Sequence, residues 1–154
     1  MMTAICRKEL AIYVVDSFSD NPYSGNPAAV CLVPFTCELT NEDKQKIASE
    51  MNHSETAFIQ ELNSEETFDK SSQFNLQWFT PTCEVSMCGH ATLASAYVLF
   101  TESHNCNKEI AFFAKCGLLT TQFTPEGAVS MDFPLAILVS TGYQILLATQ
   151  QIIS

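Results

Sequence analysis

The segment Asn52-His53-Ser54-Glu55-Thr56 contains a carboxylate whose surroundings suit proton transfer. Glu55 lies among small hydroxyl residues and directly precedes the apolar run Ala57-Phe58-Ile59. A carboxylate at the edge of an apolar strand is partly shielded from water, which favours general acid–base catalysis. The alternative interpretation is an ordinary surface glutamate at the beginning of a strand. Residue spacing alone does not decide between the two.

Cys88-Gly89-His90 is the second segment whose residues could take part in catalysis or binding, because it begins an apolar helical pattern. The free N–H groups of a helix start form an anion site that suits a carboxylate. The same position lowers a thiol pKa, which makes Cys88 a candidate nucleophile or proton-transfer group. His90 can donate a hydrogen bond to an anion or move a proton. The alternative is a buried thiol beside a capping histidine.

A metal site is a third interpretation, built from Cys83, Cys88 and His90 with His104 or Cys106. The spacing C-x4-C-x-H matches no common zinc pattern, so we expect no metal. The sequence also contains no G-x-G-x-x-G, P-loop or G-x-S-x-G pattern, which argues against nucleotide binding and serine hydrolysis. We therefore expect no cofactor.

The elements that must position these residues are predicted from composition and periodicity. The segment Cys88–Phe100 reads as a helix that is apolar on every side, and a curved sheet can surround such a helix. Thr40–Asn52 predicts a second, amphipathic helix outside the sheet. Strands are expected at Ala11–Phe18, Ala28–Val33, Ser54–Gln60, Phe74–Phe79, Glu109–Ala114, Leu118–Phe123 and Ala128–Phe133. The predicted fold class is α+β, with a central buried helix wrapped by a mostly antiparallel sheet.

Composition limits the partners of the chain. With 154 residues, 47% of them hydrophobic, the chain suits one globular domain. Its net charge of -10 disfavours nucleic acid and anionic membranes, since both repel an acidic chain. The first residues show no signal-peptide pattern, and the seven cysteines are an odd set without paired spacing. We expect reduced thiols and a cytoplasmic location.

The last 22 residues differ from the rest, because Phe133–Ser154 contains no charged residue. We divide the chain into a domain over residues 1–133 and a divergent uncharged tail over 134–154. A terminal strand pair joined near Thr141-Gly142 and a sticky tail outside the fold are the two alternatives for this segment. Low charge with high β-propensity marks aggregation-prone sequence, so we expect the tail to be the least native-like part.

Four motifs, in order, resemble the phenazine-biosynthesis-like (PhzF) family, and its animal members most closely. They are Asp16-Ser17-Phe18 with Gly25-Asn26-Pro27-Ala28-Ala29-Val30, Glu50–Phe58, Trp78-Phe79-Thr80-Pro81 with Glu84, and Cys88-Gly89-His90-Ala91-Thr92-Leu93. The resemblance runs from about Ala11 to Leu135. It implies a fold like diaminopimelate epimerase, in which two similar domains each wrap a sheet around a central helix and the active site lies between them.

The same resemblance implies roles for individual residues. Glu55 matches the family's acid/base, which moves a proton on a small carboxylate substrate. His90 and Gly89 match its site around the helix start, and Asn26 and Ser54 match positions that line the cleft. The related epimerases place a catalytic cysteine close to Cys88, but Glu55 favours the PhzF mode of catalysis.

The chain departs from the family pattern after Leu135. The Asp and the Gly-Ser-Ala helix start of the family's second domain have no match, so we expect a truncated or alternatively spliced product. Three functional hypotheses follow: an isomerase half that uses Glu55, a catalytically silent fragment that binds a protein partner or associates with itself, and an unstable product without a function.

Overall fold

All strands of the described residues belong to one mixed sheet. The computed structural model describes residues 9–21 and 23–132, and the backbone of 151–153. The strands are β1 (Ala11–Ser17), β2 (Asn26–Val33), β3 (Glu55–Gln60), β4 (Gln73–Phe79), β5 (Glu84–Val85), β6 (Glu109–Ala114), β7 (Gly117–Phe123), β8 (Val129–Asp132) and β9 (Gln151–Ile153). The helices are α1 (Asn41–Met51) and α2 (Gly89–Thr101).

The sheet is mostly antiparallel, as predicted. Its strand order is β1-β2-β3-β4-β6-β7-β8-β9, with β5 paired to β4. Only two of the described pairs are parallel, β2 with β3 and β4 with β6. A parallel pair needs a long crossover connection. Helix α1 lies in the connection between β2 and β3, and α2 lies in the connection between β4 and β6.

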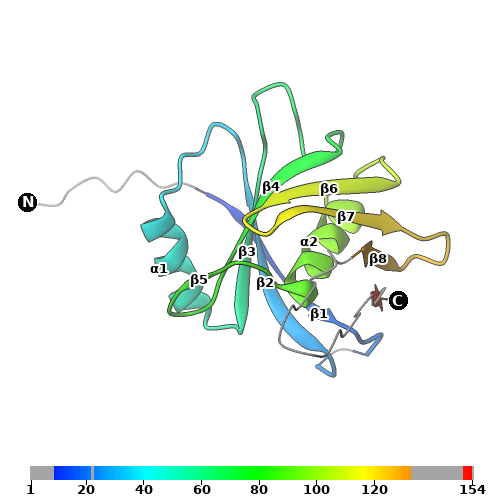
Figure 1. Ribbon diagram of the computed structural model, residues 1–154, viewed down its shortest axis with the longest axis horizontal. Coiled ribbons are helices and arrows are strands. Elements are labelled where there is room, and N and C mark those ends of the chain that lie inside the picture. The colour runs from blue at the N-terminus through cyan, green and yellow to red at the C-terminus, as the bar shows by residue number, and fades with distance from the viewer. Residues whose placement is uncertain (1–8, 22, 133–150, 154) are drawn as a thin grey trace, which may run out of the picture.

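Helix α2 lies inside the curve of the sheet, which confirms the predicted enclosed helix (Figure 1). Ten of its 13 residues are buried. The helix contacts β1, β2 and β3 on one side and β7 and β8 on the other. Because no side of α2 is polar, leaving any side in water would expose apolar surface, and the curled sheet avoids this. The main core contains Leu93, Val98 and Leu99 of α2 with Phe74, Trp78 and Phe112 of the sheet.

Helix α1 packs on the opposite face of the sheet. Its Ala48 joins a smaller core with Cys31, Val33, Phe58 and Phe79. The Thr40 side chain accepts a hydrogen bond from the Asp43 backbone N–H while the Asp43 carboxylate accepts one from the Thr40 N–H, which is a capping box. The helix ends at Asn52, which adopts the left-handed conformation with φ 52°.

The structure differs from the predicted elements at a few places. The short strand β5 was not predicted, because two residues are too few to show periodicity. Lys44 of α1 is buried, because it lies four residues before Ala48 and therefore on the same face of the helix. Its Nζ donates a hydrogen bond of 2.6 Å to Gln77 Oε1 on β4, which compensates the burial of the charge.

The predicted tail over 134–154 lies almost entirely outside the described residues. Its described part is the backbone of β9, which pairs antiparallel with β8. Within the described ranges, neither helix is long and apolar enough to cross a membrane.

Candidate active site

Glu55 and His90 come together because β3 and α2 both begin at the same end of the curled sheet. Glu55 is the first residue of β3 and pairs in register with Ala28 of β2. Alternate residues of a strand face the same side, so Glu55 shares a face with Ala57 and Ile59, which belong to the core around α2. His90 is the second residue of α2 and is buried. The structure thus places Glu55 3.2 Å from His90, with Gly89 next to His90 at the same helix start, while the catalytic roles of these residues stay a prediction.

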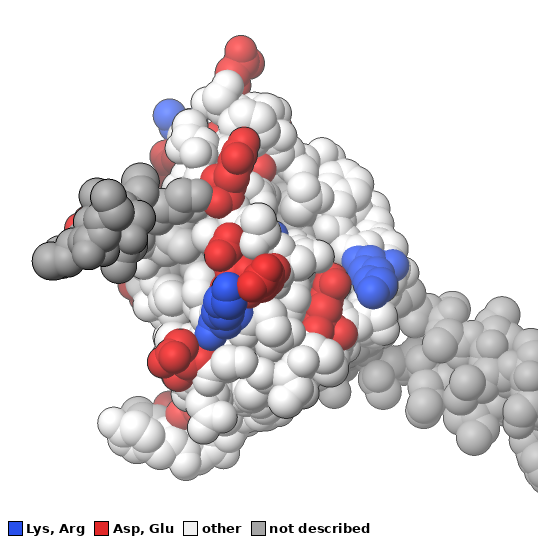
Figure 2. Space-filling model, turned by 90° about the vertical axis from the view of Figure 1, so that its left-hand side faces the viewer, with Lys and Arg blue, Asp and Glu red and all other residues white. Residues whose placement is uncertain are grey.

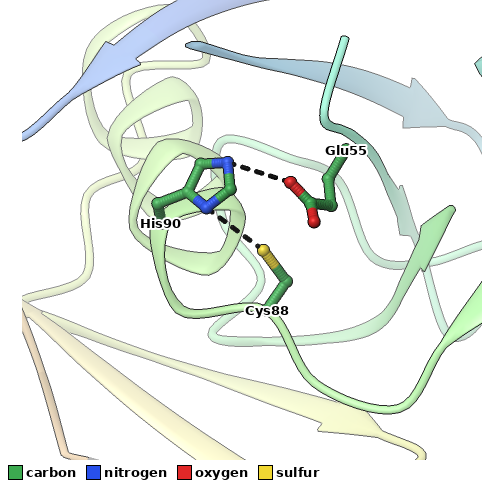
Figure 3. Close-up of side chains that lie close together, drawn as sticks. All are labelled: Glu55, Cys88 and His90. Carbon is green, nitrogen blue, oxygen red and sulfur yellow. Dashed lines mark hydrogen bonds and ion pairs between the residues drawn. The ribbon is translucent and has the colours of Figure 1, made fainter. Parts of the chain in front are cut away.

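Three side chains form the centre of the site (Figure 3). Glu55 Oε2 lies 3.2 Å from His90 Nε2, and Cys88 Sγ lies 3.3 Å from His90 Nδ1. Ser54 Oγ lies 3.4 Å from the same Nε2 and donates a hydrogen bond to the Pro27 carbonyl. The imidazole therefore connects the carboxylate on one ring nitrogen with the thiol on the other.

The neighbours of His90 assign its tautomer. A neutral imidazole has one N–H donor and one acceptor nitrogen. Glu55 Oε2 makes no hydrogen bond with Nε2, but a carboxylate 3.2 Å away favours a proton on that nitrogen electrostatically. Nδ1 is then the acceptor and receives the Cys88 S–H. This assignment orders the protons from the thiol through the ring towards Glu55.

Burial controls the protonation of both partners of Glu55. It lowers the pKa of His90 below its ordinary value of 6.5, against the opposing effects of the Glu55 charge and of a hydrogen bond to the Pro27 carbonyl. It also raises the pKa of Cys88 to about 11, although the backbone N–H groups of Ala91 and His90 favour the thiolate. The prediction that the helix start lowers the thiol pKa was wrong, because desolvation outweighs the helix N-terminus. Cys88 is a neutral thiol and not an activated nucleophile.

The Glu55 carboxylate is only partly satisfied. The side chain is 19% exposed, yet its Oε2 is buried without a hydrogen-bond partner. The 3.2 Å approach of His90 Nε2 is an ion-pair distance that lacks hydrogen-bond geometry, so we treat the contact as electrostatic proximity. A carboxylate oxygen with unused acceptor capacity, next to a neutral imidazole, is available to accept a proton.

The first turn of α2 provides a polar counterpart to the carboxylate. Cys88 is the N-cap residue, and its side chain makes no capping hydrogen bond. The first turn also contains no acidic residue. The positive end of the helix is therefore not neutralised by its own sequence, a property that favours an anion there. Gly89, half-buried at this start, offers no side chain that would block an approaching ligand.

Asn26 and Ser54 lie at the rim of this cluster. Both are exposed. Ser54 precedes Glu55 and contacts the His90 ring, whereas Asn26 begins β2, two residues before the Ala28 that pairs with Glu55. A hollow of about 560 Å³ is lined by Pro27 and His53 together with residues of the β1–β2 hairpin, and the side chains of Glu55, Cys88 and His90 do not line it. Another, of about 510 Å³, lies along β1 and α2 and is lined by Tyr13 and Tyr97.

Glu55, Cys88 and His90 also form a group whose spacing would allow a metal ion. One ligand atom of each lies within 4.8 Å of those of the other two. In the structure, the thiol contacts Nδ1 of the ring and the carboxylate lies nearest Nε2. The different zinc set considered from the sequence does not assemble among the described residues, because Cys83 is exposed and contacts Thr80 in a turn. The six described cysteines are free thiols.

Two residues of the site were missed from the sequence. The Pro27 carbonyl accepts from Ser54 and from His90, and Ser17 donates from its hydroxyl to the His90 carbonyl. Both contacts join residues far apart in the chain, and a backbone carbonyl has no sequence signal. Ser17 stands in the first family motif and at the end of an apolar strand, but neither feature indicates its bond to the His90 carbonyl.

The curled sheet around a buried helix, with a carboxylate at the helix start, defines half of a diaminopimelate-epimerase-like fold. The structure superposes on a putative PhzC/PhzF protein of Clostridium difficile with a TM-score of 0.71 at 36% identity, over 84% of this chain and 46% of that chain. It also superposes on a hydroxyproline epimerase of Agrobacterium vitis, solved with trans-4-hydroxy-L-proline, with a TM-score of 0.53 at 10% identity. That superposition covers 92% of this chain and 48% of the other, and it shows the fold alone.

Sequence comparison identifies the family. The model of the phenazine biosynthesis-like protein family (PhzC-PhzF) matches residues 15–153. A phenazine biosynthesis-like domain-containing protein of Mus musculus is 47% identical over 127 residues, or 82% of this chain and 43% of the relative. A protein of Halalkalibacterium halodurans, named an uncharacterized isomerase, is 43% identical over 127 residues, or 80% of this chain and 43% of the relative. The chain belongs to the PhzF family and spans less than half the length of these relatives.

Proposed function

We propose that this chain forms the acid–base half of a proton-transfer isomerase that acts on a small carboxylate metabolite. The observation that carries the proposal is the position of the Glu55 carboxylate, 3.2 Å from the buried imidazole of His90 and beside an uncapped helix start. Homology to proteins named as isomerases supports the reaction type. The substrate class follows from the helix start, because a carboxylate is the anion that its N–H groups suit.

In this proposal Glu55 removes a proton from a substrate carbon and returns it at another carbon. The bond that breaks is C–H, the electron pair shifts along the substrate, and the proton rests on the Glu55 oxygen between the two steps. Neutral His90 lies 3.2 Å from Glu55 Oε2 and so places a polar group beside the carboxylate without adding a second charge. Cys88 fixes the ring by donating to Nδ1. Gly89, Asn26 and Ser54 line the place of the substrate.

General acid–base catalysis by a positioned carboxylate contributes roughly 10²–10⁴-fold to a rate. The remainder of an enzymatic acceleration comes from orientation of the substrate and from stabilisation of the charge that develops in the transition state. In this site the start of α2 stabilises the developing negative charge, since its positive end lies where a substrate carboxylate or enolate would gather charge.

The test is exchange of carbon-bound hydrogen for deuterium, followed by NMR. A panel of small carboxylic acids would include a dihydro-hydroxyanthranilate-type compound and 4-hydroxyproline. We expect Glu55→Gln to reduce exchange at least about 10²-fold, because the amide cannot accept the proton. Glu50→Gln is the matched control: Glu50 is exposed on α1, outside the site. Exchange that survives in the Glu55→Gln chain would refute the assignment of the base.

A further inference from the structure

A buried hydroxyl from a distant strand holds the first turn of α2. Ser17 is the last residue of β1 and is fully buried. Its Oγ donates a hydrogen bond of 2.9 Å to the backbone carbonyl of His90, 73 residues later in the chain. The contact acts on the peptide that carries the imidazole, although Ser17 itself does not reach the ring nitrogens.

Ser17 is held firmly by its own surroundings. It pairs in register with Asn26, the first residue of β2. Gly25 approaches its backbone so closely that an added Cβ would collide with the Ser17 carbonyl oxygen. The Asp16 carboxylate also accepts a hydrogen bond of 2.7 Å from the Tyr23 backbone N–H across the same hairpin. The Ser17 hydroxyl therefore projects from a closely packed, hydrogen-bonded hairpin.

Two buried hydroxyl groups of α2 itself donate hydrogen bonds within the helix. Thr92 donates to the Cys88 carbonyl and Ser95 donates to the Ala91 carbonyl, each four residues earlier in the same helix. Those bonds are internal to the helix and cannot fix where the helix lies. The bond from Ser17 is the one of the three that ties the helix start to the sheet.

We propose that Ser17 is a positioning residue, which fixes the His90 imidazole against Glu55 by anchoring the first turn of α2 to the β1–β2 hairpin. This inference rests on the proposed function for its effect on catalysis, but its structural part stands without it. Without the hydroxyl, the first turn is free to shift, and both the Nε2–Glu55 and the Nδ1–Cys88 contacts change together. A misplacement of about 1 Å at such a site can cost 10²-fold in rate.

The experiment compares Ser17→Ala with Ser95→Ala in the full 154-residue chain. Each variant removes one fully buried hydroxyl that donates to a backbone carbonyl, so both lose similar packing and hydrogen bonding. The main readout is the ¹⁵N chemical shift of the two ring nitrogens of His90, with His53 and His104 as internal references. We expect Ser17→Ala to move the His90 shifts and Ser95→Ala to leave them in place. Equal movement in both variants, or none in Ser17→Ala, would overturn the proposal.

Two further measurements keep the inference separate from the proposed function. In the wild-type chain, the Ser17 hydroxyl proton should exchange slowly and show a through-hydrogen-bond correlation to the His90 carbonyl carbon. A rapidly exchanging hydroxyl would overturn the anchor even if Ser17→Ala failed to fold. Deuterium exchange into substrate should fall about 10²-fold in Ser17→Ala and stay within about twofold in Ser95→Ala. If the wild type exchanges no substrate, the proposed function fails while the His90 shifts still decide the role of Ser17.

Discussion

At the residue scale, the site shows how burial decides which neighbouring groups carry charge. Cys88 and His90 both lie at a helix start, yet desolvation raises the thiol pKa to about 11 and lowers the imidazole pKa. Both shifts favour the neutral form. Cys88 and His90 therefore add no charge of their own beside the Glu55 carboxylate.

We expect Glu55→Gln to lower the pKa of His90 further. The Glu55 charge favours the imidazolium, and the amide removes this effect while burial remains. An NMR titration of the ring protons would measure the change, with His53, which lines the hollow beside Pro27, as the control. A rise in the His90 pKa would contradict the geometry described above.

We also expect the stability of the domain to fall as the pH drops below about 6.5, the ordinary pKa of histidine. The folded pKa of His90 is lower than the unfolded one, so the unfolded state binds the proton first and is favoured by acid. The contribution is complete above the unfolded pKa and is lost as the pH falls through the folded pKa. Urea unfolding at several pH values would show this slope, and His90→Gln should flatten it.

The thiols should react in an order set by exposure and pKa. We expect Cys83 and Cys106, which are exposed, to be alkylated by iodoacetamide at neutral pH before the buried Cys31 and Cys88. Burial raises the pKa of Cys31 to about 12 and that of Cys88 to about 11, so little thiolate is present at either position. Peptide mass spectrometry after timed alkylation measures the order. Early modification of Cys88 would show that its thiol is more accessible than described.

At the scale of elements, the two helices illustrate what the sequence could and could not predict. The uniform apolarity of Cys88–Phe100 required an enclosing sheet, and the structure has one. The capping pattern at Thr40 located the start of α1 to within one residue. The site was predictable as far as Glu55, Gly89 and His90, because their segments follow from strand and helix starts and from the family resemblance. The Ser17 anchor, the Pro27 carbonyl and the neutral Cys88 depend on tertiary burial, which one-dimensional patterns do not encode.

The capping box of α1 can be tested directly. We expect Thr40→Ala to lower the free energy of unfolding by about 1 kcal/mol, since it leaves an N–H of the first turn without its side-chain partner. Thr40→Ser keeps the hydroxyl and should be close to wild type. Urea unfolding of the three chains measures the difference, and equal loss in both variants would point away from capping.

The β1–β2 hairpin should tolerate no side chain at Gly25. Its Cβ would collide with backbone atoms of Ser17, which cannot move without breaking the strand pair. We expect Gly25→Ala to cost roughly 1–3 kcal/mol, the usual range for an overpacked site. Gly127→Ala is the comparison: its φ of +88° strains a side chain, but nothing lies within 4 Å of the added Cβ. A smaller loss at Gly25 than at Gly127 would contradict the close approach.

At the scale of the whole molecule, the acidic surface and the exposure of Glu55 to water affect which partners and reactions suit the chain. The surface on the α1 side shows more acidic than basic side chains, in keeping with the net charge of -10 (Figure 2). This disfavours polyanionic partners. The Glu55 side chain is 19% exposed, so water reaches one side of the site. Catalysis of proton transfer on carbon benefits from a site that excludes water and stabilises developing charge.

We therefore expect the 154-residue chain to exchange substrate protons much more slowly than the full-length relative from Mus musculus, of which it spans 43%. Parallel deuterium-exchange assays on the same compounds would measure the ratio. Comparable rates would show that the described half forms a sufficient site. If the relative is active and this chain is silent, a binding or regulatory role becomes the better hypothesis for the chain.

The strand order of the sheet has a consequence for how the chain is made. From β1 to β4, and again from β6 to β8, each strand pairs with the strand that precedes it in the sequence. During synthesis each new strand therefore finds an edge already in place, which keeps loop closure short. Helix α2 is the exception, because it emerges before β7 and β8, which cover its second side. Until β7 and β8 have been synthesised, the apolar helix α2 stays partly exposed on the nascent chain. We expect chaperone binding to be most important at this stage of synthesis.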